Sequence, residues 1–246
     1  MGVADQNVRR PTNDSFSTEH VISLFSDMSQ TYGRLNLISS FGFSHVWRLA
    51  CARELRADSP VDCADLMAGG AEAAFLLREM LPAGSTIRAY DFCPEMCRLA
   101  QESMARKIAR ISVELRDVFS LPAVPSFDRI VCSFGLKTLS DAQLARFAIL
   151  IATWLRPGGK AAFVEIHVPT LSILRWPYLI YLRQVIPLLG RIAQRNANCY
   201  RWLSTYTEDF AGRDRFVSQL RDTGLRCEQK ALLFGCARLY VAMKPA

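Results

Sequence analysis

The segment at residues 61–72 constrains the fold of this chain more than any other. It reads Val-Asp-Cys-Ala-Asp-Leu-Met-Ala-Gly-Gly-Ala-Glu, so an apolar run ending at Asp65 passes through small residues into an apolar helical pattern. This order predicts a strand, a tight turn and a helix. In a parallel α/β sheet, backbone N–H groups at such a helix start can face a ligand, because small residues allow close approach. A purely structural turn is an equal alternative at this point.

The composition of the turn restricts the kind of ligand. Nucleotide pyrophosphates are usually held by three spaced glycines, whereas this turn has one glycine pair and Ala71 where a further spaced glycine would stand. The acid at Asp65 would repel a phosphate, but it suits a cation or an ammonium group. The turn therefore disfavours a phosphate site.

Acidic residues end three predicted strands. Asp65 ends the first, Asp91 the second (87–91) and Asp117 the third (112–117). Each acid alone is more typical of a turn or a helix cap. Together they predict an adenosyl ligand across the carboxyl edge of the sheet, because an acid after the second strand can bind ribose hydroxyls. Without a phosphate loop, this ligand is expected to be S-adenosylmethionine (SAM). Further strands are predicted at 128–134 and 160–165, and a hairpin at Gly235 completes the sheet.

Length and composition favour one globular domain. The chain has 246 residues, 50% of them hydrophobic. We expect a flexible N-terminus at 1–18 and a single domain at 19–246. The eight cysteines are scattered without a Cys-x-x-Cys pair, which predicts free thiols in a reducing compartment and no metal site. The first residues carry no apolar signal core, so a cytoplasmic protein is expected.

Two segments flank the predicted sheet. Residues 19–50 have apolar positions at helical spacing, interrupted near Gly33 and Gly42, and predict lid helices or helices that cover the sheet edge. Residues 168–210 form an apolar insertion interrupted by arginines and prolines, so a membrane-spanning helix is not expected. The insertion suits either an anionic membrane surface or the wall of an apolar pocket, and a buried helix pair is the alternative. The net charge of +7 comes without a recognisable nucleic-acid module, so no nucleic-acid partner is predicted.

The ordered motifs of the chain resemble the class I SAM-dependent methyltransferases, and among them the UbiE-type enzymes that C-methylate precursors of ubiquinone and menaquinone. The resemblance runs from about Val21 to Phe210. It implies a Rossmann-like α/β fold with a mostly parallel seven-stranded sheet, an N-terminal helical lid and an apolar helical insertion. The motifs that carry it are Tyr32 with Asn36, Ser40-Phe41-Gly42, Trp47, the Asp65 turn, Asp91 with Pro94-Glu95-Met96, Ser133-Phe134-Gly135-Leu136, Leu155-Arg-Pro-Gly-Gly, Glu165, Ile186-Pro-Leu-Leu-Gly-Arg, Asn196 and Tyr200-Arg201.

The same resemblance implies a role for individual residues. Tyr32 would close the lid, and Ser133 would line the floor beneath the methyl group. The remaining cofactor contacts would be Asp65 and Gly69 at the methionine end, Asp91 at the ribose, Phe92 and Met96 on the adenine face, and Asp117 and Val118 at the adenine edge.

Three departures from the family pattern lie near the expected reaction centre. Lys137-Thr138 replaces an Arg-Asn pair. The guanidinium of arginine offers several N–H donors in a fixed planar arrangement, whereas the ammonium of lysine is a compact positive charge. Glu72 closes an altered Gly-Ala-Glu turn, and His167 follows Glu165 where a small polar residue is usual. Lys137, Tyr32, His167 and Glu72 are therefore the candidate catalytic residues. A lone histidine after a strand is more often structural.

Relative to the family pattern, the residues expected at the reaction centre are changed while those expected at the adenosine of the cofactor are kept. This combination leads to a hypothesis about the reaction. The chain resembles the RquA-type branch, which converts ubiquinone to rhodoquinone by ring amination. UbiE-like ring C-methylation, methylation of a natural-product phenol, and a non-enzymatic scaffold are the alternatives. The expected partners are a lipophilic quinone, the surface of the inner membrane, and a quinone-biosynthesis complex or a second copy of the chain.

Overall fold

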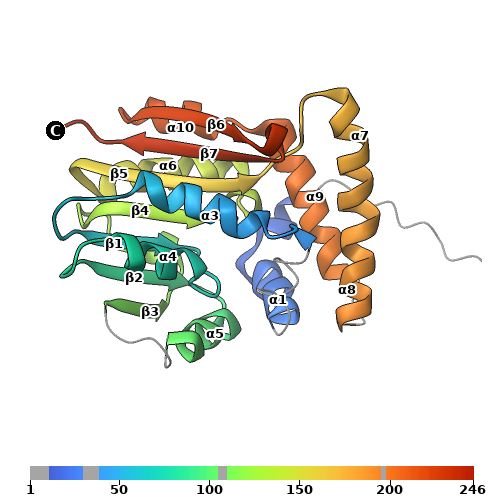
Figure 1. The fold of residues 1–246 in the computed structure, drawn as a ribbon, viewed down its shortest axis with the longest axis horizontal. Helices are drawn as coiled ribbons and strands as arrows, with labels where there is room; N and C mark the ends of the chain where they lie inside the picture. Colours follow the sequence, from blue (N-terminus) through green and yellow to red (C-terminus); the bar gives the residue numbers. More distant parts are fainter. Residues whose placement is uncertain (1–10, 30–38, 105–109, 195–197) are drawn as a thin grey trace, which may run out of the picture.

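The computed structural model describes residues 11–29, 39–104, 110–194 and 198–246 (Figure 1). These residues form a seven-stranded sheet in the order β3-β2-β1-β4-β5-β7-β6. Neighbouring strands are parallel from β3 to β5, and β7 pairs antiparallel with both β5 and β6. The predicted mostly parallel Rossmann-like sheet and its closing hairpin are therefore confirmed. The strands are β1 (Asp62–Leu66), β2 (Thr86–Asp91), β3 (Ile111–Leu115), β4 (Phe127–Ser133), β5 (Leu155–Ile166), β6 (Arg226–Leu232) and β7 (Ala237–Met243).

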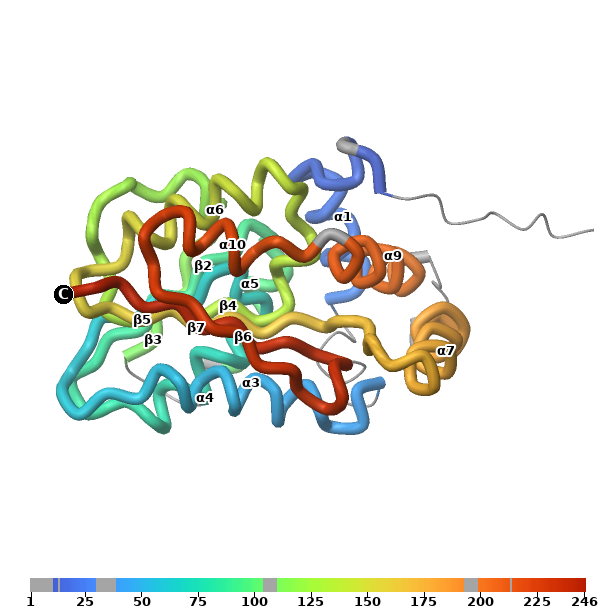
Figure 2. The backbone as a smooth tube through the Cα atoms, turned by 90° about the horizontal axis from the view of Figure 1, so that it is seen from above, coloured from blue at the N-terminus to red at the C-terminus, as the bar shows by residue number. Residues whose placement is uncertain are grey.

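Helices cover both faces of the sheet. The helices α3 and α4 lie on one face, and α6 and α10 lie on the other (Figure 2). Because both faces are covered, central strands such as β1 and β4 are largely buried. The edge strand β6 instead alternates charged residues, which discourages pairing with another sheet. The covering elements are α3 (Phe43–Glu54), α4 (Glu72–Met80), α5 (Pro94–Met104), α6 (Asp141–Trp154) and α10 (Phe216–Asp222), with short turns η1 (Asn13–Phe16), η2 (Val118–Ser120), η3 (Leu136–Thr138) and η5 (Leu233–Gly235).

A second group of helices gathers beyond the carboxyl ends of the parallel strands, on the right in Figure 1. It consists of α1 from the predicted lid segment and of the 168–210 insertion, which forms two helical layers. In the first layer, π-helical η4 joins α7 to α8 in a continuous rod. No helix within the described ranges is long and apolar enough to cross a bilayer. The bounds are α1 (Thr18–Met28), α7 (Ser172–Ile180), η4 (Tyr181–Val185), α8 (Ile186–Gln194) and α9 (Asn198–Arg213).

The contact between α8 and α9 depends on one glycine. Gly190 on α8 faces the buried ring of Tyr200 on α9, and a Cβ atom at Gly190 would lie 2.0 Å from the ring atom Cδ2. Only a residue without a side chain allows the two helices to approach this closely.

We expect Gly190→Ala to destabilise the protein by about 1–3 kcal/mol, because the added methyl group overpacks this contact. Gly212→Ala on α9 is the matched control, since a Cβ there would meet nothing within 4 Å and alanine favours a helix. Urea denaturation of both variants measures the difference. Equal stability of the two variants would show that α8 and α9 do not pack as described.

Candidate functional site

Two pockets meet at the carboxyl edge of the sheet and share Phe134, which follows β4. The smaller is a narrow cleft between α1 and the ends of β1, β2 and β4. The larger is a cavity of about 460 Å³ between α3, the α7–η4–α8 rod, α9 and η5. The cleft is lined by Val21, Phe25, Arg48, Met67, Ala68, Gly69, Glu72, Ala73, Asp91, Phe92, Met96, Ser133, Phe134, Gly135 and Thr138.

The turn after β1 forms the inner wall of the cleft. Its backbone takes positive φ at Met67 (54°), Gly69 (55°) and Ala71 (60°), which is costly for the two residues with side chains. Asp91 stabilises this turn, since its Oδ2 accepts a hydrogen bond from the Gly69 N–H at 2.8 Å. Its Oδ1 accepts from the Cys93 N–H, also at 2.8 Å. Burial raises the pKa of Asp91, although these backbone donors act in the opposite direction.

Two buried polar atoms near the cleft lack a hydrogen-bond partner among the described residues. One is the Ser133 Oγ atom and the other is Asp65 Oδ1. Such atoms are rare in folded proteins and indicate a missing partner. The Ser133 hydroxyl and the carboxylates of Asp91 and Glu72 give the cleft an acceptor-rich lining, which fits a ligand with ribose hydroxyls and a positive charge. The residues present therefore fit SAM.

The structure brings five of the eight predicted cofactor residues to this cleft, together with Glu72 from the predicted catalytic set. The five cofactor residues that line it are Gly69, Asp91, Phe92, Met96 and Ser133.

Three predicted cofactor residues do not line the cleft. Asp65 is 1% exposed beneath the turn, where its Oδ2 accepts a hydrogen bond from the Ala74 N–H at 2.9 Å. Asp117 caps η2 by accepting from the Phe119 N–H at 2.9 Å, and Val118 is buried in the core. Strand-end acids often cap the following helical turn, and two of the three acids do so here. The expectation that all three point into one cleft is therefore corrected.

Glu72 and Arg48 form the side of the cleft nearest the cavity. Arg48 Nη2 lies 3.8 Å from Glu72 Oε1, and the Arg48 guanidinium lies 4.7 Å from the centre of the Phe134 ring. Phe134 itself has a positive φ of 64°. Strained non-glycine backbone often marks functional sites, and here it places one aromatic ring between the two pockets.

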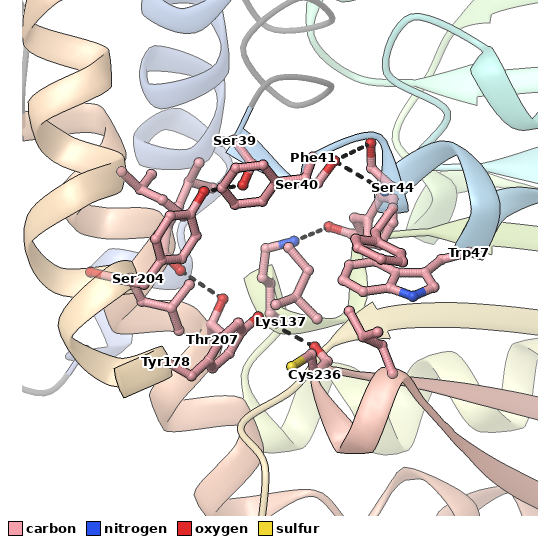
Figure 3. Close-up of a pocket in the computed structure, with 18 of the residues that line it drawn as sticks. Ser39, Ser40, Phe41, Ser44, Trp47, Lys137, Tyr178, Ser204, Thr207 and Cys236 are labelled. Carbon is pink, nitrogen blue, oxygen red and sulfur yellow. Dashed lines mark hydrogen bonds between the residues drawn. The ribbon is translucent and has the colours of Figure 1, made fainter. Parts of the chain in front are cut away.

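The cavity has an almost entirely apolar and aromatic lining (Figure 3). The predicted apolar insertion supplies much of it, through Leu174, Pro177 and Tyr178 of α7 and several residues of α9. The Tyr181 hydroxyl donates a hydrogen bond to the Ser39 carbonyl and so connects the rod to the chain before α3. Burial raises the pKa of Tyr178 far above its ordinary value, so this phenol stays neutral. Other lining residues are Ser40, Phe41, Phe43, Ser44, Trp47, Lys137, Ile166, Leu182, Ile186, Tyr200, Leu203, Ser204, Thr207, Leu233, Phe234 and Cys236.

Lys137 is the cationic residue of the cavity lining. Figure 3 shows its side chain extending into the middle of the pocket. The ammonium group donates to Glu165 Oε1 at 3.0 Å and to the Phe134 carbonyl. An ammonium has three donors, so one donor has no hydrogen-bond partner among the described residues. Lys137 is 3% exposed and Glu165 is 0% exposed, so water screens this ion pair weakly.

The other two candidate catalytic residues are placed differently. His167 lies outside both pockets, with its Nε2 3.6 Å from Asp214 Oδ2 and its Nδ1 3.1 Å from the Val168 carbonyl oxygen. The structure thus brings His167 to a buried carboxylate rather than to the reaction centre, as expected for a structural histidine. Tyr32 lies outside the described residues, as do Asn36 and Asn196 of the family motifs.

Sequence reasoning did not select Arg48 or Glu165 as site residues. Both are buried charges, and their partners come from distant segments: Glu72 for Arg48, and Lys137 for Glu165. A signal was present for Arg48, because it is a charged residue beside Trp47 on the apolar side of a helix. The pairing that gives each charge its function depends on tertiary structure.

The geometry can be compared with known proteins. The model of the ubiE/COQ5 methyltransferase family matches residues 13–244. The demethylmenaquinone methyltransferase of Deinococcus radiodurans is 30% identical over 240 residues, covering 96% of this chain and 98% of that protein. The enzyme of the same name from Thermus thermophilus is 26% identical, covering 90% of this chain and 100% of that protein.

The fold is similar to that of human N-acetylserotonin methyltransferase in complex with SAM, with a TM-score of 0.56, 18% identity, and coverage of 91% of this chain and 59% of that one. Sequence match, sheet order and an acceptor-rich cleft at the carboxyl edge agree with one another, and the predicted UbiE-type relationship is confirmed. The chain belongs to the ubiE/COQ5 methyltransferase family and is a SAM-dependent transferase.

Proposed function

We propose that this protein methylates a ring carbon of a lipophilic, prenylated quinol. The observation that carries the proposal is the Lys137 ammonium, which offers its remaining donor to an apolar cavity directly beside the cofactor cleft. The cavity matches an aromatic ring with an apolar tail. The relatives named demethylmenaquinone methyltransferases support quinone chemistry and ring methylation.

The reaction requires little from the protein beyond positioning and charge. SAM supplies a methyl group that its sulfonium already activates. A ring carbon becomes nucleophilic when the ring hydroxyl loses its proton to solvent at the cavity opening, and the Lys137 ammonium stabilises the resulting oxyanion. The carbon that gains the methyl group then loses its own hydrogen to solvent as a proton. Glu165 and the Phe134 carbonyl hold this ammonium in place. The apolar walls exclude water and keep the ring close to the cleft.

The setting of the reaction is part of the proposal. A prenylated substrate resides in a membrane, so we infer that the protein works at the cytoplasmic surface of the inner membrane. Association with a second copy or with other quinone-biosynthesis enzymes stays a prediction.

Ring amination, the conversion of ubiquinone to rhodoquinone, is the second candidate. Glu72 in the cleft and Lys137 in the cavity favour it, because both depart from the family pattern at the positions nearest the reaction centre. The comparisons favour methylation, since the named relatives are methyltransferases. Methylation is therefore the principal proposal.

Mass spectrometry of the products distinguishes the two reactions. Purified protein is incubated separately with a demethylated menaquinol and with ubiquinone, in the presence of SAM carrying a deuterated methyl group. We expect the demethylated quinol to gain one labelled methyl group. Loss of a methoxy group from ubiquinone with gain of an amine would overturn the proposal in favour of amination. No change in either substrate would favour another phenol or a non-enzymatic role.

Asp91→Asn tests the assignment of the cofactor cleft. We expect it to weaken SAM binding about tenfold to a hundredfold, because hydrogen bonds to a charged acceptor contribute about 1.5–3 kcal/mol each. Isothermal titration calorimetry measures the affinity directly. Asp222→Asn, an exposed change of the same kind on α10, should leave it unaltered. Equal affinities of the two variants would show that SAM does not occupy this cleft.

Lys137→Met tests the stabilisation of the oxyanion. We expect the turnover rate to fall about a hundredfold or more while SAM affinity stays unchanged. The single change leaves the Glu165 carboxylate buried without its partner, at a cost of about 3–5 kcal/mol. The double variant Lys137→Met with Glu165→Gln removes both charges. It should recover stability in urea denaturation without recovering activity, and a double variant with near wild-type turnover would contradict the role of Lys137.

A further inference from the structure

The rod α7–η4–α8 is apolar on two opposite sides. On its inner side, Leu174, Tyr178 and Tyr181 line the cavity. On its outer side, large apolar side chains are exposed on the surface of the chain. A helix that is apolar all round is normally covered on both sides. The cavity accounts for the inner side, and the outer side needs a second apolar environment.

The exposed residues form an apolar surface along the rod, which we call the outer face. They follow one another at intervals of three and four within α7 and of four within α8, so each helix presents them on one side. Single exposed apolar residues are common on protein surfaces, but a large contiguous patch marks an interaction site. The outer face consists of Ile173 (82% exposed), Trp176 (66%), Ile180 (51%), Leu188 (54%) and Ile192 (74%).

The rod itself carries only positive charges, of which Arg183 is paired with Glu208 of α9. The sequence between Glu165 and Glu208 contains several arginines and no acidic residue. Arg175 on α7 and Arg191 on α8 are exposed beside the outer face. A two-fold contact between copies of this chain would place these arginines opposite one another without carboxylates to pair with them. A surface that is apolar and positively charged instead complements an anionic lipid bilayer.

The rim of the cavity adjoins the same rod. Phe41 and Phe234 line the cavity and are also 79% and 74% exposed, which places both at its opening. The Phe41 ring lies 5.9 Å from that of Tyr181, and the segment of Phe234 is joined to α7 by a hydrogen bond from Tyr178 to the Cys236 carbonyl at 3.4 Å. Both rim residues have positive φ, 50° and 55°. The backbone thus holds two aromatic rings in solvent, at a strain cost, next to the outer face.

We propose that the outer face is a docking surface for an anionic lipid bilayer. The rod lies in the plane of the headgroups with Ile173 and Trp176 inserted among the acyl chains, and Phe41 and Phe234 bring the cavity opening to the membrane. A prenylated substrate then enters the cavity without leaving an apolar environment. The entry route rests on the proposed function, whereas the docking itself does not.

Vesicle flotation tests the docking surface. The full-length protein is mixed with vesicles of phosphatidylcholine alone or with added phosphatidylglycerol. We expect binding to the anionic vesicles, weakened by salt, together with a blue shift of tryptophan emission that Trp176→Phe abolishes. Ile173→Glu should lower vesicle affinity about tenfold or more, because a buried apolar side chain is replaced by a charge that lipid headgroups repel.

Ile149→Glu is the matched control, since Ile149 is 58% exposed on α6, far from the rod. It should bind vesicles like the unaltered protein. Failure of the unaltered protein to bind anionic vesicles, or equal loss in both variants, would overturn the proposal. A lipid-free dimer that Ile173→Glu dissociates would overturn it in favour of a second copy of the chain.

A further assay separates this proposal from the proposed function. With a short-chain, water-soluble quinol, Ile173→Glu should turn over at the unaltered rate, whereas with a long-chain quinol in anionic vesicles its rate should fall in step with binding. If no quinol of either kind is modified, the proposed function fails while vesicle binding still decides the docking surface. An equal loss with both quinols would place Ile173 in the reaction itself and contradict a docking role.

Discussion

The site depends on one buried ion pair, between Lys137 after β4 and Glu165 near the end of β5. Burying two charges is costly and is offset only when their remaining hydrogen-bonding capacity is satisfied. Glu165 meets this condition, because it accepts from the Lys137 ammonium and from the backbone N–H groups of Lys137 and Ile166 at 2.9–3.0 Å. The pair therefore fixes the backbone after two neighbouring strands and presents a positive charge inside an apolar cavity. In such a cavity, a single charge interacts with an oxyanion far more strongly than it would in water.

The two pockets provide different environments on either side of Phe134. The cleft is rich in oxygen acceptors and suits a charged nucleoside, whereas the cavity is aromatic and suits a lipid-like ring. The Phe134 ring has two cations near it, Arg48 at 4.7 Å and Lys137 at 5.8 Å from its centre. Its N–H donates to the Val164 carbonyl at 2.8 Å, which holds the strained residue against β5. Both reactants can thus bind next to the Phe134 ring, each in the pocket whose environment suits it.

The sequence was sufficient to predict the elements whose signals are local. Apolar runs marked the strands, and the small residues after Asp65 marked the turn that lines the cleft. The direction in which an individual side chain points was harder to predict, since a carboxylate at a strand end can bind a ligand or cap the next helical turn. All three acids accept hydrogen bonds from backbone N–H groups, but of the three Asp91 alone also lines the cleft. The position of His167 was hard to predict for a related reason: its partner, Asp214, is distant in the sequence and close in space.

The state of a bound phenol tests the central role of Lys137 most directly. A chromogenic phenol that fills the cavity can be titrated in the complex, with its absorbance reporting ionisation. If the Lys137 ammonium stabilises an oxyanion, the bound phenol will ionise at a lower pH than the free phenol, and the double variant Lys137→Met with Glu165→Gln will lose this shift. An apolar cavity without an effective cation would instead raise the pKa of the bound phenol, because burial disfavours the charged form. Ionisation at a higher pH in the unaltered protein would therefore contradict a catalytic role for Lys137.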